Sequence, residues 1–375
     1  MLILKIFISV CFIFTLGLSV NGIDADDISA KSAVVINRET KEIIFEKNAY
    51  EKRSMASTTK IMTALLACES GRLYETVEIT ASMCGAEGTS LGLKAGYKLK
   101  LYDLVAGMML KSGNDAANAV AVFLGGNMEA FAKMMNEKAY AIGMRCTNFV
   151  TPSGLDDQNH YTTAYDMALL GAAAMENIIL KNICSHKTMK IDYISPDIRV
   201  TYSNHNKLLS YYNGTYGIKT GFTKKSGRCL VSASKGEKGD YICVTLSASD
   251  DWNDHKKLFD YAYETSVRQD VYVRIPECIT VEGGVFQTLR IEAVEVSTLF
   301  FKNEAEIKQR IYLPFFIYAP VKKGDIVGYA ELFTNDNTLV KIPITAAENC
   351  SGTEATYTPK KTLKEKIKEF LHIKN

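Results

Sequence analysis

The chain has 375 residues, of which 23% are charged and 47% are hydrophobic, and its formal net charge is +2. A length above the roughly 100 to 200 residues of one domain favours a larger domain and a smaller one. The balanced charge excludes a strongly basic nucleic-acid-binding protein, and the hydrophobic content excludes a disordered chain.

The first residues predict a secretory signal peptide over residues 1–25. Lys5 precedes an apolar run over residues 6–20, and the small residues Gly22 and Ala25 follow. The alternative is an uncleaved membrane anchor, but the run is shorter than the roughly 20 residues that a spanning helix needs. We therefore expect an exported protein, with the cleavage position left open between Gly22 and Ala25.

Nine cysteines would suggest disulfides in an exported protein. Cys11 lies in the signal peptide, and the other eight show no paired spacing. Cys68 and Cys243 lie in apolar stretches, where a free thiol behaves as a small hydrophobic side chain. We expect mostly reduced and buried cysteines.

The segment after the signal predicts an antiparallel hairpin and then a buried helix. Residues 33–36 and 42–46 are rich in β-branched side chains and are joined by the polar residues 37–40. Residues 57–67 form a helical pattern whose apolar run is too continuous for a surface helix. This helix is therefore expected at the centre of its domain.

The remainder of the first domain predicts a helical cluster and then three strands and a helix. The clearest helices are expected at residues 104–110, 116–124, 128–142 and 163–175. From Gly217 the pattern changes to strands, with the clearest at 228–233 and 241–246, and a helix is expected around 254–263. This order excludes repeated βαβ units and indicates an α+β domain with a mostly antiparallel sheet, which we place at residues 26–266.

The last third of the chain predicts a small all-β domain and a terminal helix. Residues 270–350 are rich in strand formers and have turn signals at 283–284, 322–325 and 335–337. Residues 358–375 carry apolar side chains at helical spacing among lysines. Such an amphipathic basic helix either packs on the protein body or lies in a membrane interface, and export favours the membrane.

Ser57 is the candidate nucleophile, with Lys60 as its base. A spacing of three places both side chains on one helix face, about 5 to 6 Å apart at Cβ. A serine hydroxyl needs a base, and a lysine can serve once desolvation or positive charge lowers its pKa. Ser232 and Lys235 have the same spacing but lie in a predicted strand, where they point to opposite faces, so we discard them.

Two further motifs add the groups that such a nucleophile needs. Ser112 and Asn114 lie between two predicted helices, where the hydroxyl can relay protons and the amide can hold a substrate backbone. Lys219 and Thr220 lie on a strand-like segment and supply a cation and a hydroxyl, while Gly221 leaves room for a substrate. Together these residues predict a carboxylate receptor beside a nucleophile.

The three motifs resemble those of the low-molecular-mass penicillin-binding proteins, the serine-type D-alanyl-D-alanine carboxypeptidases. The likeness runs from about Ala33 to the C-terminal tail, and it is most evident at residues 55–65, 112–119, 154–157, 160–164, 217–223 and 227–231. The resemblance implies a penicillin-recognising, serine transpeptidase-like domain followed by a small β-domain. It implies no cofactor and no metal.

The resemblance also implies a role for each residue in the acylation step. Ser57 would attack the carbonyl between two D-alanines of a peptidoglycan stem peptide, and Lys60 would take its proton. Ser112 would help to deliver a proton to the leaving D-alanine. The backbone N–H groups of Ser57 and Phe222 would form the oxyanion hole.

The remaining motif residues are expected to bind the substrate. Asn114 would hold the peptide, and Lys219 and Thr220, followed by Gly221, would receive its terminal carboxylate. β-Lactams are then expected as covalent inhibitors. The implied place of action is the outer face of the cytoplasmic membrane or the cell wall space, where the basic C-terminal helix would contact the membrane surface.

Other interpretations carry less weight. An endopeptidase of the same fold remains open, because cleft shape decides that preference. A serine β-lactamase is disfavoured because no glutamate loop stands out between Ser112 and Lys219, and a non-enzymatic module is disfavoured because all three motifs are intact. We expect His160 to be structural, and we prefer Ser112 to the alternative central motif at residues 202–204.

Overall fold

The computed structural model describes residues 23–293, 296–303, 306–334 and 338–353. Most of the predicted signal peptide (residues 1–25) and the whole predicted helix at 358–375 lie outside these residues. The described residues form two compact units, which divide at residues 269 and 270. Residues 299–303 return to the first unit, where the carbonyl of Phe300 accepts a hydrogen bond from Asn37 Nδ2 at 3.0 Å. The sequence did not predict this return.

A five-stranded antiparallel sheet organises the first unit. Its order is β2-β1-β9-β8-β7, and its strands are β1 (Ser32–Asn37), β2 (Ile43–Lys47), β7 (Thr215–Thr223), β8 (Gly227–Gly236) and β9 (Gly239–Ala248). Successive side chains alternate between the two faces: Val34 and Ile36 enter one hydrophobic cluster, and Ala33 and Val35 enter another. The predicted hairpin and the predicted strands are therefore confirmed.

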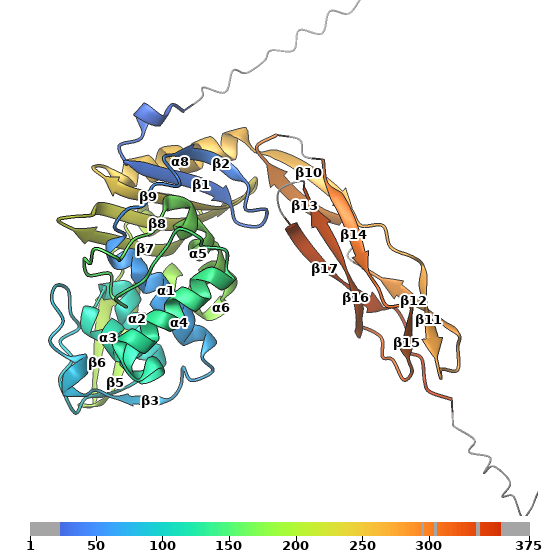
Figure 1. Ribbon diagram of the computed structural model, residues 1–375, viewed down its shortest axis with the longest axis horizontal. Helices are drawn as coiled ribbons and strands as arrows, with labels where there is room; N and C mark the ends of the chain where they lie inside the picture. Colours follow the sequence, from blue (N-terminus) through green and yellow to red (C-terminus); the bar gives the residue numbers. More distant parts are fainter. Residues whose placement is uncertain (1–22, 294–295, 304–305, 335–337, 354–375) are drawn as a thin grey trace, which may run out of the picture. The chain divides into compact units, whose positions relative to one another are not determined.

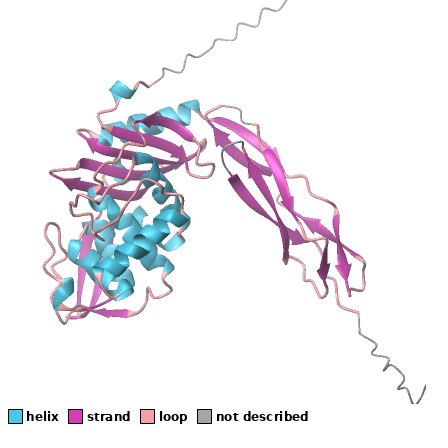
Figure 2. Ribbon diagram, viewed as in Figure 1, coloured by secondary structure: helices cyan, strands magenta, loops and turns pink. Residues whose placement is uncertain are grey.

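Helices cover both faces of this sheet (Figures 1 and 2). On one face α8 (Asp251–Thr265) packs against β1, β8 and β9. On the other face lie α5 (Ala164–Glu176), α2 (Leu101–Lys111), α3 (Asn114–Gly125) and α4 (Met128–Ala141), which form the predicted helical cluster. The predicted buried helix α1 (Lys60–Glu69) and α6 (Ile178–Ser185), which was not predicted, lie on the same face. Shorter helical segments are η1 (Ala25–Asp27), η2 (Ala56–Thr59), η3 (Ala81–Met83) and α7 (Leu208–Tyr211).

The helix expected at residues 57–67 begins differently from the prediction. Residues 56–59 form the 3₁₀ turn η2, and the α-helix α1 starts only at Lys60. Eight of the ten residues of α1 are buried, which agrees with the central position expected from its apolar run. The tighter turn matters because side chains three apart are eclipsed in a 3₁₀-helix.

A second, smaller sheet was not predicted. It has the order β3-β4-β5-β6 and consists of β3 (Thr76–Glu78), β4 (Lys98–Lys100), β5 (Thr188–Ser195) and β6 (Ile198–Ser203). Two of its strands have three residues each, too short for an alternating pattern to be visible. The sheet packs against α2 through β5 and β6, next to the segment that carries Ser112.

The second unit is all β, as predicted. Its larger sheet has the order β14-β16-β17-β12-β11-β15, with strands β11 (Cys278–Glu282), β12 (Thr288–Glu292), β14 (Lys308–Tyr312), β15 (Phe316–Tyr318), β16 (Ile326–Phe333) and β17 (Thr338–Ala346). Alternate residues of β11 and β12, such as Ile279 and Leu289, enter one hydrophobic cluster. A separate pair joins β10 (Val267–Tyr272) to β13 (Val296–Phe301).

Two further observations concern the cysteines and the lengths of the helices. The eight cysteines within the described ranges form no disulfide, and five of them are buried. Within the same ranges, no single helix has the length and apolar character to cross a membrane. In the described part of the chain, one pair of consecutive helices, α5 and α6, has this length and apolar character when taken together, but the two helices meet at an angle of 101°.

Candidate active site

Ser57 lies in a strained turn in the middle of the first unit. It is the second residue of η2, and the preceding Ala56 has a φ of 48°, in the left-handed region that costs energy for residues with a Cβ. The eclipsed spacing of the turn brings the Ser57 hydroxyl to 2.8 Å from Lys60 Nζ. The two side chains predicted to share a proton are therefore within hydrogen-bond distance.

The Lys60 amine is enclosed. The side chain is 0% exposed, and besides Ser57 its Nζ has two partners, Asn114 Oδ1 at 2.6 Å and the backbone carbonyl of Ser153 at 2.6 Å. Burial lowers the pKa of Lys60 well below its usual value, and the nearby positive charge of Lys219 lowers it further, while Asp115 opposes this shift. The amine is therefore biased toward its neutral form.

The hydrogen-bonding capacity of a neutral amine matches these three partners. A neutral amine has two N–H donors and one lone pair. Two of the partners, Asn114 Oδ1 and the Ser153 carbonyl, can only accept a hydrogen bond. The third partner is the Ser57 hydroxyl, which can donate. In the ammonium form Lys60 Nζ donates to Ser57 Oγ. In the neutral form the lone pair of Lys60 would instead face the Ser57 hydroxyl proton, which is the proton that a general base removes.

Asn114 is fixed by both ends of its amide. It opens α3, its Oδ1 accepts from Lys60, and its Nδ2 donates to the backbone carbonyl of Glu87 at 2.5 Å. The next residue, Asp115, accepts hydrogen bonds from Ser90 Oγ at 2.6 Å and from the backbone N–H groups of Leu91 and Leu93. Residues 87–93 are thus held against the start of α3, a contact that no sequence pattern indicated.

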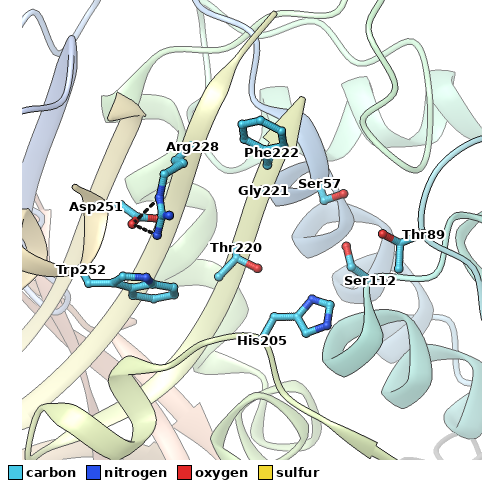
Figure 3. Close-up of a pocket in the computed structure, with 10 residues that line it drawn as sticks. All are labelled: Ser57, Thr89, Ser112, His205, Thr220, Gly221, Phe222, Arg228, Asp251 and Trp252. Atoms are coloured by element: carbon cyan, nitrogen blue, oxygen red, sulfur yellow. Dashed lines mark hydrogen bonds and ion pairs between the residues drawn. The ribbon is translucent and has the colours of Figure 1, made fainter. Parts of the chain in front are cut away.

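Ser112 faces the same pocket as Ser57. It ends α2 with a φ of 67°, and the structure places it with Ser57, Thr89 and Thr220 around one pocket (Figure 3). The alternative central motif at residues 202–204 has structural contacts instead, since the Tyr202 hydroxyl lies 2.9 Å from that of Tyr193. The geometry therefore places Ser112, and not Tyr202, around the pocket that Ser57 lines.

The third motif lies on the edge strand β7, beside the nucleophile turn. Lys219 is 1% exposed, its Nζ donates to the carbonyl of Thr220 at 3.0 Å, and burial lowers its pKa to about 7. A Cβ added at Gly221 would lie 3.0 Å from the backbone nitrogen of Ser57. A side chain at this position would require Ser57 or β7 to shift by a few tenths of an ångström, so glycine favours the close approach.

Two adjoining pockets meet at Ser57. The first, of about 500 Å³, is lined by Ser57, Thr89, Ser112, His205, Thr220, Gly221, Phe222, Arg228, Asp251 and Trp252. The second, of about 460 Å³, is lined by Ser57, Glu87, Gly88, Thr89, Asn114, Ser153, Gly154, Leu155, Asp156, Phe222, Thr223 and Lys224. Their shared residues place the nucleophile at the boundary between two binding regions.

Arg228 is a cation of the first pocket that the sequence did not single out. Its Nε donates to Asp251 Oδ1 at 2.8 Å, and its Nη2 donates to the same oxygen. The guanidinium carbon lies 5.7 Å from the centre of the Trp252 ring, and the side chain is 41% exposed. Figure 3 shows Thr220 between this group and the two serines. The buried Lys219 does not line the pocket, whereas Arg228 does.

His160 contacts η2, the turn that carries Ser57. His160 Nδ1 accepts from the backbone N–H of Val150 at 2.9 Å, so its Nε2 carries the proton and donates to Thr59 Oγ1 at 2.8 Å. Burial lowers the pKa of His160 to about 4. These contacts agree with the structural role expected for His160. The discarded Ser232 contacts His255 inside the sheet and α8 layer.

Comparisons with known proteins identify relatives of both units. The family described as D-alanyl-D-alanine carboxypeptidase matches residues 19–250, and the family described as penicillin-binding protein 5, C-terminal domain, matches residues 290–351. D-alanyl-D-alanine carboxypeptidase DacF of Bacillus subtilis is 31% identical over 335 residues, which cover 85% of each chain. A D-alanyl-D-alanine endopeptidase of Pseudomonas aeruginosa is 30% identical over 59% of this chain and 72% of its own.

Solved structures agree with these relatives. The crystal structure of the D-alanyl-D-alanine carboxypeptidase DacD from Francisella tularensis is similar with a TM-score of 0.63 and 29% identity. The similarity covers 88% of this chain and 95% of that one. The predicted α+β fold is therefore confirmed.

We predict that Gly154→Ala destabilises the first unit because Gly154 has a φ of +85° and an added Cβ would lie 1.9 Å from the carbonyl oxygen of Ala56. Gly96→Ala is the matched control, since Gly96 has a φ of +88° with no atom within 4 Å of the added Cβ. Backbone strain alone costs about 1 to 2 kcal/mol. Urea unfolding should show a loss at Gly154 that exceeds the control by about 2 kcal/mol or more. Equal losses would contradict the close contact.

Proposed function

This chain belongs to the D-alanyl-D-alanine carboxypeptidase family, and we propose that its reaction proceeds through an ester of Ser57. The activity is that of a serine-type D-Ala-D-Ala carboxypeptidase, a hydrolase. The proposal concerns the residues that perform the reaction. The observation that carries it is the enclosed Lys60 amine, 2.8 Å from the Ser57 hydroxyl at the boundary of two pockets.

Acylation begins with proton transfer from Ser57 to Lys60. As the Ser57 oxygen bonds to the carbonyl carbon of the penultimate D-alanine, the neutral Lys60 amine takes the hydroxyl proton. When the C–N bond breaks, the terminal D-alanine leaves as an amine and needs a proton. Ser112 relays that proton from the Lys60 ammonium. Water then hydrolyses the ester with Lys60 again as base, which restores Ser57.

The oxyanion that forms during both steps needs backbone donors. Ser57 is near the start of a helix, where the first N–H groups have no partner within the helix. The second donor that we assign is the N–H of Phe222, the residue after Gly221, and the close approach of Gly221 to the Ser57 nitrogen supports this assignment. Each such donor contributes about 3 to 4 kcal/mol to transition-state stabilisation.

The two pockets suit the two ends of the substrate. We assign the terminal carboxylate to the first pocket, which holds the Thr220 hydroxyl and the half-exposed Arg228. Asp251 occupies Nε and Nη2 of Arg228, which leaves the Nη1 side of the guanidinium for a carboxylate. Lys219 contributes its positive field from behind the strand. The rest of the peptidoglycan stem peptide then lies in the second pocket, beside Asn114.

The place of action is proposed from the sequence. The signal pattern at residues 1–25 supports export, and the basic amphipathic pattern at 358–375 supports association with the outer face of the cytoplasmic membrane. β-Lactams are proposed as covalent inhibitors that acylate the same serine. An endopeptidase that cleaves internal peptide cross-links remains the second candidate, because the endopeptidase relative is 30% identical.

We expect Ser57→Ala to abolish labelling by a fluorescent penicillin while the protein stays folded. Lys60→Ala should slow labelling by about 10²- to 10⁴-fold, because the general base is lost. Both are checked by gel fluorescence and circular dichroism. Labelling retained in Ser57→Ala would refute the nucleophile assignment, and an unchanged rate in Lys60→Ala would refute the base.

The two lysines should give opposite limbs to the pH profile. Lys60 acts when neutral, so the acylation rate should fall as acid protonates it. This fall should occur at a pH well below the pKa of a free lysine, because the pKa of Lys60 is lowered. Lys219 acts when charged, and its pKa of about 7 in the free enzyme should make kcat/KM for a free-acid peptide fall above about pH 7. A bound carboxylate favours the ammonium, so the limb in kcat should lie at higher pH. A flat profile from about pH 6 to about pH 10 would contradict these roles.

Arg228→Gln should remove most of the preference for a free terminal carboxylate. A charge-assisted hydrogen bond contributes about 1.5 to 3 kcal/mol, so the ratio of kcat/KM for D-Ala-D-Ala peptide over its C-terminal amide should fall about tenfold or more. Lys224→Gln is the matched control, with the same charge change in the second pocket.

Three results of this assay have distinct meanings. An unchanged ratio in Arg228→Gln would refute the carboxylate assignment. Equal cleavage of acid and amide by the wild type would favour the endopeptidase. Rapid penicillin turnover without D-alanine release would indicate a β-lactamase.

A further inference from the structure

We propose that the second unit carries a membrane-contact surface of its own, at the end where β15 meets the loop of residues 283–287. The ligand is the interface of an anionic phospholipid bilayer. The inference rests on the proposed membrane association of residues 358–375, but a different set of residues carries it. We call this surface the aromatic tip and define it by Val285, Phe286, Phe315, Phe316 and Tyr318.

Large apolar side chains are exposed at the aromatic tip. Phe315 is 98% exposed, Tyr318 73%, Phe286 58%, Val285 54% and Phe316 42%. A scattered exposed apolar residue is normal on a soluble protein, but a group of this kind on one end of a small domain marks an interaction surface. Aromatic side chains are enriched at the boundary between lipid and water, where their rings contact both.

The tip is a rigid platform rather than a loose loop. Tyr318 is paired with Glu282 of the neighbouring strand β11, and the rings of Phe316 and Tyr318 meet edge to face at 5.3 Å. The backbone N–H of Val285 donates to the carbonyl of Ser351 at 2.9 Å. The backbone of the tip and the rings of Phe316 and Tyr318 are therefore held in place before any partner binds, which lowers the entropy cost of binding.

The described chain ends at this tip. The backbone N–H of Thr353 donates to the carbonyl of Gly283 at 2.8 Å, beside Val285 and Phe286. Lys360, the first lysine of the basic amphipathic pattern, is the seventh residue after Thr353. Seven extended residues span at most about 25 Å. When that pattern lies in a membrane interface, the aromatic tip is tethered within about 25 Å of the same surface.

The tip suits a bilayer better than a protein strand. β15 is a three-residue edge strand with Pro314 and Pro320 beside it, and proline blocks the backbone pairing by which another strand would add. The exposed charged residues nearby carry both signs: Lys322 and Lys323 are positive, and Glu282 and Asp325 are negative. The tip therefore binds by apolar insertion, and its contribution should resist salt, whereas that of the lysine-rich tail should not.

The test compares vesicle binding of matched triple variants of the chain from residue 23 to 375. Phe286→Ser, Phe315→Ser and Tyr318→Ser are combined in the tip variant. Tyr74→Ser, Tyr140→Ser and Tyr211→Ser, which change side chains of 70%, 69% and 72% exposure in the first unit, are combined in the control. Sedimentation with vesicles of phosphatidylcholine and about 30% phosphatidylglycerol gives the partition coefficients. We expect about a tenfold loss for the tip variant, persisting in high salt, and less than about a twofold loss for the control.

Further measurements separate this proposal from the others. Tyr318→Trp should gain emission that brominated phospholipid quenches, which tests the tip even where the triple variant fails to fold. A tip variant that partitions like the wild type, or added emission in Tyr318→Trp that lipid does not quench, would overturn the proposal. Failure of the tail proposal shows differently, as unchanged partition after removal of residues 358–375. Failure of the proposed reaction shows as no D-alanine release from a soluble peptide by any of these proteins.

Discussion

The enclosure of one amine is the constraint on which the active site depends. A lysine that is removed from water loses the hydration that stabilises its charge, and no carboxylate contacts Lys60 Nζ among its partners within the described chain. The three partners that remain suit the neutral form. The same burial that makes Lys60 costly for folding lowers its pKa, as the proposed general base requires, and the positive charge of Lys219 lowers that pKa further.

The surrounding fold serves to hold that amine against the Ser57 hydroxyl. Lys60 is the first residue of α1, a helix that is almost fully buried. Asn114 is held at the start of α3, because the neighbouring Asp115 binds the backbone of residues 87–93. Gly154 and His160 press on η2 from one side, and Gly221 lets β7 approach from the other. In the proposed mechanism, rigid positioning of this kind lets a neutral lysine activate the serine without a histidine.

The sequence predicted those parts of this arrangement that follow from a short, contiguous residue pattern. The period of apolar residues predicted the helices from 102 to 176 and the strands β8 and β9, and the spacing of Ser57 and Lys60 predicted their meeting. It missed the second sheet, in which β3 and β4 have only three residues each and β4 pairs with the distant β5. It also missed the carbonyl of Ser153, because a backbone group has no residue-type signature. Arg228 was missed for a related reason. Only the approach of α8 to β8 reveals that this arginine faces Thr220 in a pocket.

The protonation state of Lys60 in the free enzyme tests this account most directly. Lysine labelled with ¹³C at Cε allows each ammonium to be titrated by NMR, and comparison with Lys60→Gln and Lys219→Gln assigns the two buried signals. The account predicts that the Lys60 signal titrates well below the usual 10.5 and moves upward in Lys219→Gln, because a neighbouring positive charge is lost. A Lys60 signal that titrates near 10.5 would contradict it.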